Sequence, residues 1–252
     1  MKLSLVIPTY NSMKYVEQCV ESALNQDYDN YDIHIYDNGS TDGSLEYVTN
    51  QASEHNRITL HQVPNIYKNS YREAVDHCFE NLETDYITFL SSDDYLEPSY
   101  VSNCMKIMSH NPEKIKCIQS GITNIKNGVY SGEQIHFYKN LDDFKTQAMH
   151  RSPVNTPTVV YHKSLYSLMQ WTPYGGEAHK ANNLEEAGAG DYDMFCGFAH
   201  EGVFIFPVNT CLGYCYRWHQ EQCTWDVIKQ KQEGSVNFEK VIQDYWRKKW
   251  QM

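Results

Sequence analysis

Three segments in the first 90 residues are predicted to be strands, and each ends in a polar segment that favours a turn. These segments occupy residues 3–7, 31–36 and 85–90, and segments with helical spacing of apolar residues separate them. Residues 3–7 are an apolar run without polar alternation, which is typical of a strand buried on both faces of a sheet. The strand–helix–strand order also predicts parallel pairing. The chain is therefore expected to be an α/β protein with a mostly parallel sheet flanked by helices.

The remaining elements follow from the same patterns with looser boundaries. Strands are expected at 57–63, 115–120 and 158–161, and helices at 70–82, 163–170 and 191–200. A further helix is expected after a cap at Asn11 or Ser12, another from about residue 44, and a last one from residue 236. The polar, glycine-flanked stretch 175–190 favours a loop over a site.

Charge and cysteine usage narrow the class of protein. The 252 residues carry 21 basic and 32 acidic side chains, and the net charge of -11 argues against nucleic acid or an anionic membrane as the main partner. The eight cysteines are scattered, which favours reduced thiols over a disulfide framework. With no signal-like or membrane-spanning segment recognised, the expectation is a soluble cytoplasmic protein.

The polar turns are expected to meet in space. In an open parallel sheet, ligands bind outside the carboxyl ends of the strands. Thr9, Asp37 and Asp93 all follow predicted strands directly, so they should gather at one edge although 84 positions separate the first from the last.

Asp93 and Asp94 carry the strongest local signal. Two adjacent carboxylates at a strand end repel each other unless a cation or hydrogen-bond donors neutralise them, which points to a metal. The alternative is a turn and helix cap before Pro98. The segment 37–42 (DNGSTD) allows the same structural explanation, because Asp, Asn and Gly favour turns.

The order of these motifs resembles glycosyltransferase family 2, whose members have the GT-A nucleotide-sugar fold. The matching segments are 6–11 (VIPTYN), Ser22 with Gln26 and Tyr28, 37–42, and 86–98 (YITFLSSDDYLEP). A thinner likeness continues through 157–158, 190–193 and 216–219. The resemblance implies a GT-A (Rossmann-like) catalytic domain over residues 1–225, with a nucleotide-binding half at 1–110, an acceptor-binding half at 111–225 and a helical tail at 226–252.

The resemblance also assigns roles to residues. It implies that Thr9 and Asp37 contact the nucleotide base and that Asp93 binds a divalent metal, with Asp94 beside it and His219 as a further ligand. Asp191 corresponds to the catalytic base. The residues so expected to bind the nucleotide sugar are Pro8, Thr9, Tyr10, Asp37, Arg72, Ser92 and Asp93.

Several residues have alternative interpretations. Asp191 also suits a helix N-cap or an acid in the first turn of a helix. Cys211, Cys215, His219 and Cys223 recur every four residues and are all possible zinc ligands. Trp171, Tyr174 and Trp218 are candidates for sugar stacking. At Asn38, Ser91 and Gly190 the chain departs from the acids usual in the family.

The expected function is that of a metal-dependent inverting glycosyltransferase. It would transfer a sugar from a UDP-sugar to a glycan or lipid-linked acceptor, with Mn²⁺ or Mg²⁺ as the metal. The alternatives are a nucleotide-sugar hydrolase and a non-catalytic carbohydrate- or nucleotide-binding module. In the tail, Trp246 and Trp250 with the basic residues between them suggest a peripheral membrane anchor, a homodimer contact or docking onto the core.

Overall fold

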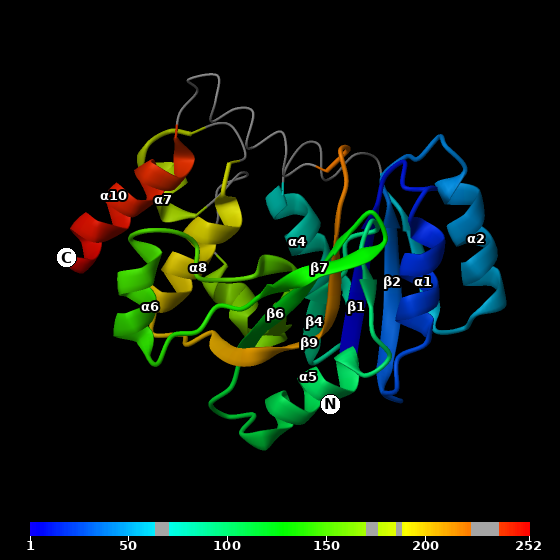
Figure 1. Ribbon diagram of the computed structural model, residues 1–252, viewed down its shortest axis with the longest axis horizontal. Coiled ribbons are helices and arrows are strands. Elements are labelled where there is room, and N and C mark those ends of the chain that lie inside the picture. Colours follow the sequence, from blue (N-terminus) through cyan, green and yellow to red (C-terminus); the bar gives the residue numbers. More distant parts are fainter. Residues whose placement is uncertain (64–70, 170–175, 185–187, 223–236) are drawn as a thin grey trace.

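The computed structural model describes residues 1–63, 71–169, 176–184, 188–222 and 237–252, and within them one mixed sheet has nine strands. The strands lie in the order β3-β2-β1-β4-β8-β6-β9-β5, and β7 pairs with β6 (Figure 1). Their bounds are β1 Leu3–Thr9, β2 Tyr31–Asp37, β3 Ile58–Gln62, β4 Tyr86–Phe89, β5 Tyr95–Leu96, β6 Cys117–Lys126, β7 Val129–Gln134, β8 Val160–His162 and β9 Phe206–Trp218.

The helices cover both faces of this sheet (Figure 1). The α-helices are α1 Val16–Leu24, α2 Ser44–Glu54, α4 Tyr71–Asn81, α5 Tyr100–His110, α6 Leu141–Ala148, α7 Glu177–Ala181, α8 Gly190–His200 and α10 Phe238–Trp250, and the 3₁₀ helices are η1 Thr156–Thr158 and η2 Lys163–Leu168.

The N-terminal half of the sheet confirms the predicted parallel order. β3, β2, β1 and β4 pair in parallel with one another. The register places Thr9, the last residue of β1, beside Asp37, the last residue of β2. The two predicted base contacts therefore lie next to each other at the carboxyl edge.

The second half of the sheet is mixed. β8 is antiparallel to both β4 and β6, and β6 pairs in parallel with β9. The two-residue strand β5 is antiparallel to β9, with Tyr95 opposite Cys215. This pairing brings the segment that follows β4 close to the C-terminal end of β9.

Two sequence expectations about helices need correction. The helix after β1 begins at Val16, and neither Asn11 nor Ser12 caps it through a side chain, because both side chains bind other loops. The predicted helix at 163–170 is the 3₁₀ helix η2 in its described part.

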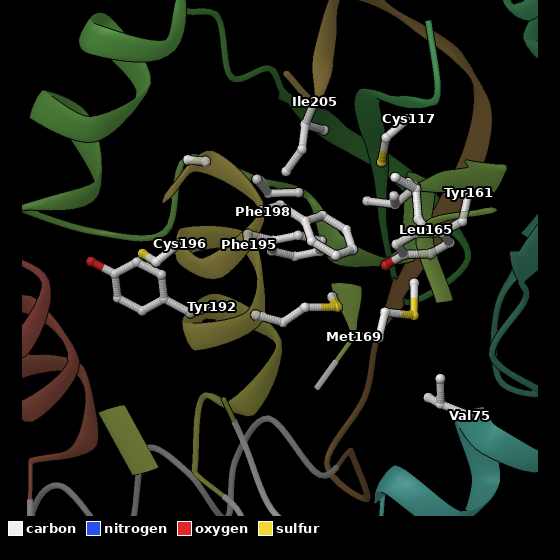
Figure 2. Close-up of a cluster of buried hydrophobic side chains, with 14 of the residues drawn as sticks. Val75, Cys117, Tyr161, Leu165, Met169, Tyr192, Phe195, Cys196, Phe198 and Ile205 are labelled. Carbon is white, nitrogen blue, oxygen red and sulfur yellow. The ribbon is translucent and has the colours of Figure 1, made fainter. Parts of the chain in front are cut away.

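Side chains that alternate along the strands build one apolar cluster on each face of the sheet. On β1, Leu5 and Ile7 belong to the cluster that includes α1 and α5, whereas Val6 belongs to the cluster that includes α4, α8 and α10. Phe195 and Phe198 carry α8 into the second cluster (Figure 2). The helices on each face are thus fixed to the sheet by fully buried apolar side chains.

The C-terminal helix α10 docks onto this core, next to α7 and α8 (Figure 1). Ile242 and Trp246 are fully buried, and the Trp246 indole N–H donates to Asp193 at 2.7 Å. Core docking is therefore the correct interpretation for Trp246, which is not available as a membrane anchor. No helix in the described ranges is long and apolar enough to span a bilayer.

The stretch 175–190 also differs from the expected loop. Its described part contains α7, and the His179 side chain is fully buried against α8. The seven cysteines within the described ranges are free thiols, as expected, and Cys223 lies outside those ranges.

Candidate donor-binding and catalytic site

The loops that follow β1, β2 and β4 are tied together by side chains. The backbone N–H of Asn11 donates to Ser40 Oγ at 3.0 Å, and that of Ser12 donates to Ser44 Oγ at 2.8 Å. The Ser12 hydroxyl also lies 2.7 Å from the hydroxyl of Ser92. These bonds hold the three predicted turn segments in one rigid edge.

A pocket of about 370 Å³ opens at this edge. The predicted binding residues that line it are Pro8, Thr9, Tyr10, Ser92, Asp93 and His219. The sequence prediction missed Ser12, Tyr15, Tyr216, Glu221 and Gln222, which also line it. In the sequence, Tyr15 falls at an apolar position of the helix expected after Asn11 or Ser12. Only its place one turn after the first loop indicates a site residue.

Buried polar groups lie at the strand ends beside the pocket; Thr9 and Asn38 line it, whereas the predicted base contact Asp37 is not among its lining residues. Asp37 is 1% exposed, and its Oδ1 accepts the backbone N–H groups of Gly39 and Ser40 at 3.0 Å each. Asp37 Oδ2, Thr9 Oγ1 and Asn38 Oδ1 are buried without a hydrogen-bond partner among the residues that the structure describes. Because buried polar atoms are nearly always paired, three unpaired atoms together indicate a place where a polar ligand binds.

Asp93 and His219 meet although 126 positions separate them. Asp93 Oδ2 and His219 Nε2 are 2.9 Å apart at the pocket, and the ring of Tyr15 lies 4.6 Å from the imidazole ring. A carboxylate and an imidazole are both suitable ligands for Mn²⁺, and two protein ligands suffice where substrate phosphates complete the shell. Over the described ranges, no three His, Cys, Asp or Glu side chains group as a metal site.

Asp94 points away from the pocket and corrects one expectation. It is fully buried, and its two oxygens accept from the Tyr214 hydroxyl at 2.9 Å and the Arg217 backbone N–H at 2.8 Å. Burial, helped by the charge of Asp93, raises the pKa of Asp94 to about 8. Asp94 therefore fastens the loop to β9, and the expectation that it binds the metal is not kept.

Arg217 supports the same loop from the side of β9. Its guanidinium donates to the backbone carbonyl of Asp93 and to the side chain of Gln18. It also lies over the rings of Tyr15 and Tyr95, at 5.3 and 4.8 Å from their centroids. One cation thus holds the backbone on which the Asp93 carboxylate stands.

Asp191 lies in the first turn of α8 and is half-buried. One carboxylate oxygen accepts the Tyr192 backbone N–H at 2.9 Å, and the other accepts the Thr156 hydroxyl. The N-cap of α8 is Ala189, so Asp191 is not the cap, but its place as an acid in the first turn agrees with the structural alternative. Asp191 is not among the residues that line the pocket.

The structure argues against the alternative of a zinc site. Cys211 and Cys215 lie on β9, a strand rather than a helix, and about 3.3 Å per residue separates them by about 13 Å along it. His219 instead faces Asp93. Cys223, Trp171 and Tyr174, like the side chain of Arg72, lie outside the described part of the chain.

A pocket at the carboxyl ends of parallel strands is the place where open-sheet α/β proteins bind their ligands. The chain belongs to one family of such proteins, because the Glycosyl transferase family 2 model matches residues 4–169.

Curated relatives include two chondroitin synthases. The enzyme of Pasteurella multocida is 29% identical over 209 residues, which is 83% of this chain and 20% of the relative. The enzyme of Escherichia coli is 28% identical over 213 residues, or 83% of this chain and 28% of the relative. The chain thus spans a fifth to about a quarter of these relatives.

Solved structures show the same fold. S. aureus TarS 1-349 in complex with UDP-GlcNAc has a TM-score of 0.64 and 18% identity, covering 98% of this chain and 70% of the other. A mannosyltransferase of Pyrobaculum calidifontis in complex with GDP-Man and Mn²⁺ has a TM-score of 0.62 and 14% identity, covering 98% and 69%. The predicted GT-A fold is therefore confirmed.

Proposed function

We propose that this protein is a metal-dependent, inverting glycosyltransferase that transfers a sugar from a UDP-sugar to a glycan or lipid-linked acceptor. The observation that carries the proposal is the pair of unpaired buried atoms, Asp37 Oδ2 and Thr9 Oγ1, of which Thr9 lines the pocket. They stand at the adjacent ends of β1 and β2, within the segment that the family model matches.

The free oxygen of Asp37 supports uracil as the base. Its Oδ1 is occupied by two backbone N–H groups, so a single carboxylate oxygen remains to accept from a ligand. Uracil offers one imide N–H, whereas guanine offers two adjacent N–H donors that match both oxygens of a carboxylate. A guanine base would leave one donor unpaired here, and an unmade buried hydrogen bond costs about 1–3 kcal/mol.

Asp93 and His219 would hold Mn²⁺ or Mg²⁺ at the diphosphate. The metal supplies positive charge that stabilises the departing diphosphate. The hydroxyl groups of Ser12 and Ser92 line the same part of the pocket and can donate to phosphate oxygens.

Asp191 would serve as the general base. Its carboxylate takes the proton of an acceptor hydroxyl while that oxygen attacks the anomeric carbon, and the bond from this carbon to the diphosphate breaks. The electron pair leaves with UDP, and attack opposite to the leaving group inverts the anomeric configuration. The names of the relatives suggest chondroitin- or hyaluronan-type glycans as acceptors to test first.

Calorimetric titration with UDP and GDP, each with and without Mn²⁺, tests the donor site. Asp37→Asn keeps the oxygen that holds the turn and replaces the free one by an amide, so UDP affinity should fall about 10- to 100-fold even without metal. Asp93→Ala should remove the gain in affinity that Mn²⁺ gives and leave metal-free binding unchanged. Equal affinity for GDP and UDP, or an unaffected Asp37→Asn variant, would refute the uracil assignment.

A turnover assay separates a transferase from its alternatives. Released UDP is measured for a set of UDP-sugars with Mn²⁺ or Mg²⁺, with and without chondroitin and hyaluronan oligosaccharides. A transferase releases UDP faster with an acceptor and extends that acceptor, whereas a hydrolase is indifferent to it. Metal-dependent UDP binding with neither activity would indicate a binding module.

A further inference from the structure

The Asp191 carboxylate has one hydrogen-bond donor on each oxygen. The backbone N–H of its neighbour Tyr192 donates to Oδ1 at 2.9 Å, and the Thr156 hydroxyl donates to Oδ2 from 35 positions away. Each carboxylate oxygen has capacity for a second bond, so the group can still accept a proton. Of the two donors described, only Thr156 is a side chain.

Thr156 stands on a turn that is unusually well fixed. It begins η1, and the preceding Asn155 is buried, with its side-chain N–H₂ donating to the carbonyls of Ser120 and Gln134 at 3.0 Å each. Asn155 Oδ1 accepts from the Gln134 side chain at 2.8 Å, and Thr158 Oγ1 accepts the Ser120 N–H at 3.0 Å. Fully satisfied buried networks of this kind hold one conformation.

The same turn is connected to the donor side of the site. The buried Thr88 hydroxyl, on β4, donates to the carbonyl of Val159 at 3.0 Å, directly after η1. β4 is the strand that leads into Asp93. The turn that carries Thr156 is therefore hydrogen-bonded to β4, the strand that leads into the predicted metal ligand Asp93.

The start of α8 is held from the opposite side as well. Asp193, fully buried two residues after Asp191, accepts from the backbone N–H of Ala178, the imidazole of His179 and the indole of Trp246. The helix backbone is thus fixed independently of Thr156. What Thr156 adds is the orientation of the Asp191 side chain.

We propose that Thr156 is a positioning residue for the transfer reaction, holding the Asp191 carboxylate in the orientation in which it accepts the proton of the acceptor hydroxyl. This inference rests on the proposed role of Asp191 as the general base. Reacting groups must be held close to their productive geometry, and a displacement of about 1 Å can cost about 100-fold in rate.

Two variants separate the hydroxyl from the shape of the side chain. Thr156→Val keeps the branched shape and removes the donor, whereas Thr156→Ser keeps the donor and removes a methyl group. With the donor and acceptor that give turnover in the assay above, Thr156→Val should lower kcat about 10- to 100-fold with the donor KM nearly unchanged. Thr156→Ser should stay within about threefold of wild type.

A double-variant cycle distinguishes positioning from a general structural role. Thr156→Val combined with Asp191→Asn should lose no more activity than Asp191→Asn alone, because Thr156 acts through Asp191. Additive losses, equal losses in the Val and Ser variants, or a normal kcat in Thr156→Val would overturn the proposal. Near-normal turnover of Asp191→Asn would instead refute the base assignment, and the role of Thr156 with it, while UDP binding would still test the donor site separately.

Discussion

Two buried polar regions of this protein differ in how their atoms are paired. At the junction of α7, α8 and α10, Asp193 has donors on both oxygens, and the His179 ring donates to Asp193 at 2.8 Å and to the Gly188 carbonyl at 2.7 Å. At the strand ends beside the pocket, Thr9 Oγ1 and Asp37 Oδ2 have no partner within the described chain.

The difference separates groups that serve the fold from groups that await a ligand. Each ring nitrogen of His179 lies within hydrogen-bond distance of an oxygen, one of Asp193 and one of Gly188. The polar atoms of this pair therefore have partners inside the protein. Thr9 Oγ1 and Asp37 Oδ2 lose their hydrogen bonds to water on folding and find no replacement among the described residues, so they lower the stability of the protein.

The largest effect is expected for His179→Leu. Removal of the imidazole breaks a fully buried histidine–carboxylate pair with a contact of 2.8 Å, which should lower the free energy of unfolding by roughly 3–5 kcal/mol. Urea unfolding measures the change. His179→Leu combined with Asp193→Leu should recover part of the loss, and UDP affinity should stay normal in every variant that folds, because neither residue lines the pocket. A decrease in the free energy of unfolding below about 1 kcal/mol would show that the pair does not stabilise the junction of α7, α8 and α10.

Trp246→Phe tests the same region more gently. The substitution keeps an aromatic ring in the core but removes the N–H that donates to Asp193 at 2.7 Å. A hydrogen bond to a charged group contributes about 1.5–3 kcal/mol, and a loss of that size is expected in the same unfolding experiment. An unchanged stability would mean that the backbone N–H groups of Ala178 and His179, together with the His179 ring, suffice for Asp193.

Thr9→Val and Thr158→Val compare the two kinds of buried hydroxyl directly. Both threonines are 1% exposed, but Thr158 Oγ1 is paired with Ser120 and Asn155, whereas Thr9 Oγ1 has no partner in the described chain. Thr158→Val should destabilise by about 1–3 kcal/mol, whereas Thr9→Val should be neutral or stabilise by about 1 kcal/mol and weaken UDP binding. Equal destabilisation by both would contradict the comparison.

The smallest effect concerns a histidine without an acidic partner. Burial, and then the neighbouring His34 and His77, lower the pKa of His61 from 6.5 to about 4. Between these pH values the unfolded chain binds the proton and the folded protein does not, so stability should fall as the pH drops from about 6.5 to about 4. His61→Phe, which keeps the ring stacked on Tyr36, should flatten this dependence in urea unfolding at pH 5 and 7. Because His61 is only half-buried, the change is expected to be small.

The fold of the first half could be predicted because its signals are local. β1, β2 and β4 fall on the predicted strand segments 3–7, 31–36 and 85–90, and one-residue alternation along β1 sends Leu5 and Val6 into different clusters. The second half could be predicted only loosely. The β6–β9 pairing joins residues about 90 positions apart, and no local pattern encodes such a partner.

For the site, the sequence alone determined which strand ends carry polar groups and where the family motifs lie. It did not determine the direction of each side chain. Asp93 and Asp94 are adjacent in the chain, yet only Asp93 lines the pocket, because pairing with β9 turns Asp94 toward Tyr214 and Arg217.

Tertiary structure likewise decided which hydroxyl donates to Asp191 and where the Trp246 side chain is buried. Thr156 is 35 positions from Asp191, and Trp246 is 53 positions from Asp193. Local sequence determines strands, turns and helix faces through backbone preference and apolar spacing. The contacts that orient a carboxylate or bury an indole form only when distant segments pack together, and their geometry is a property of the packed core.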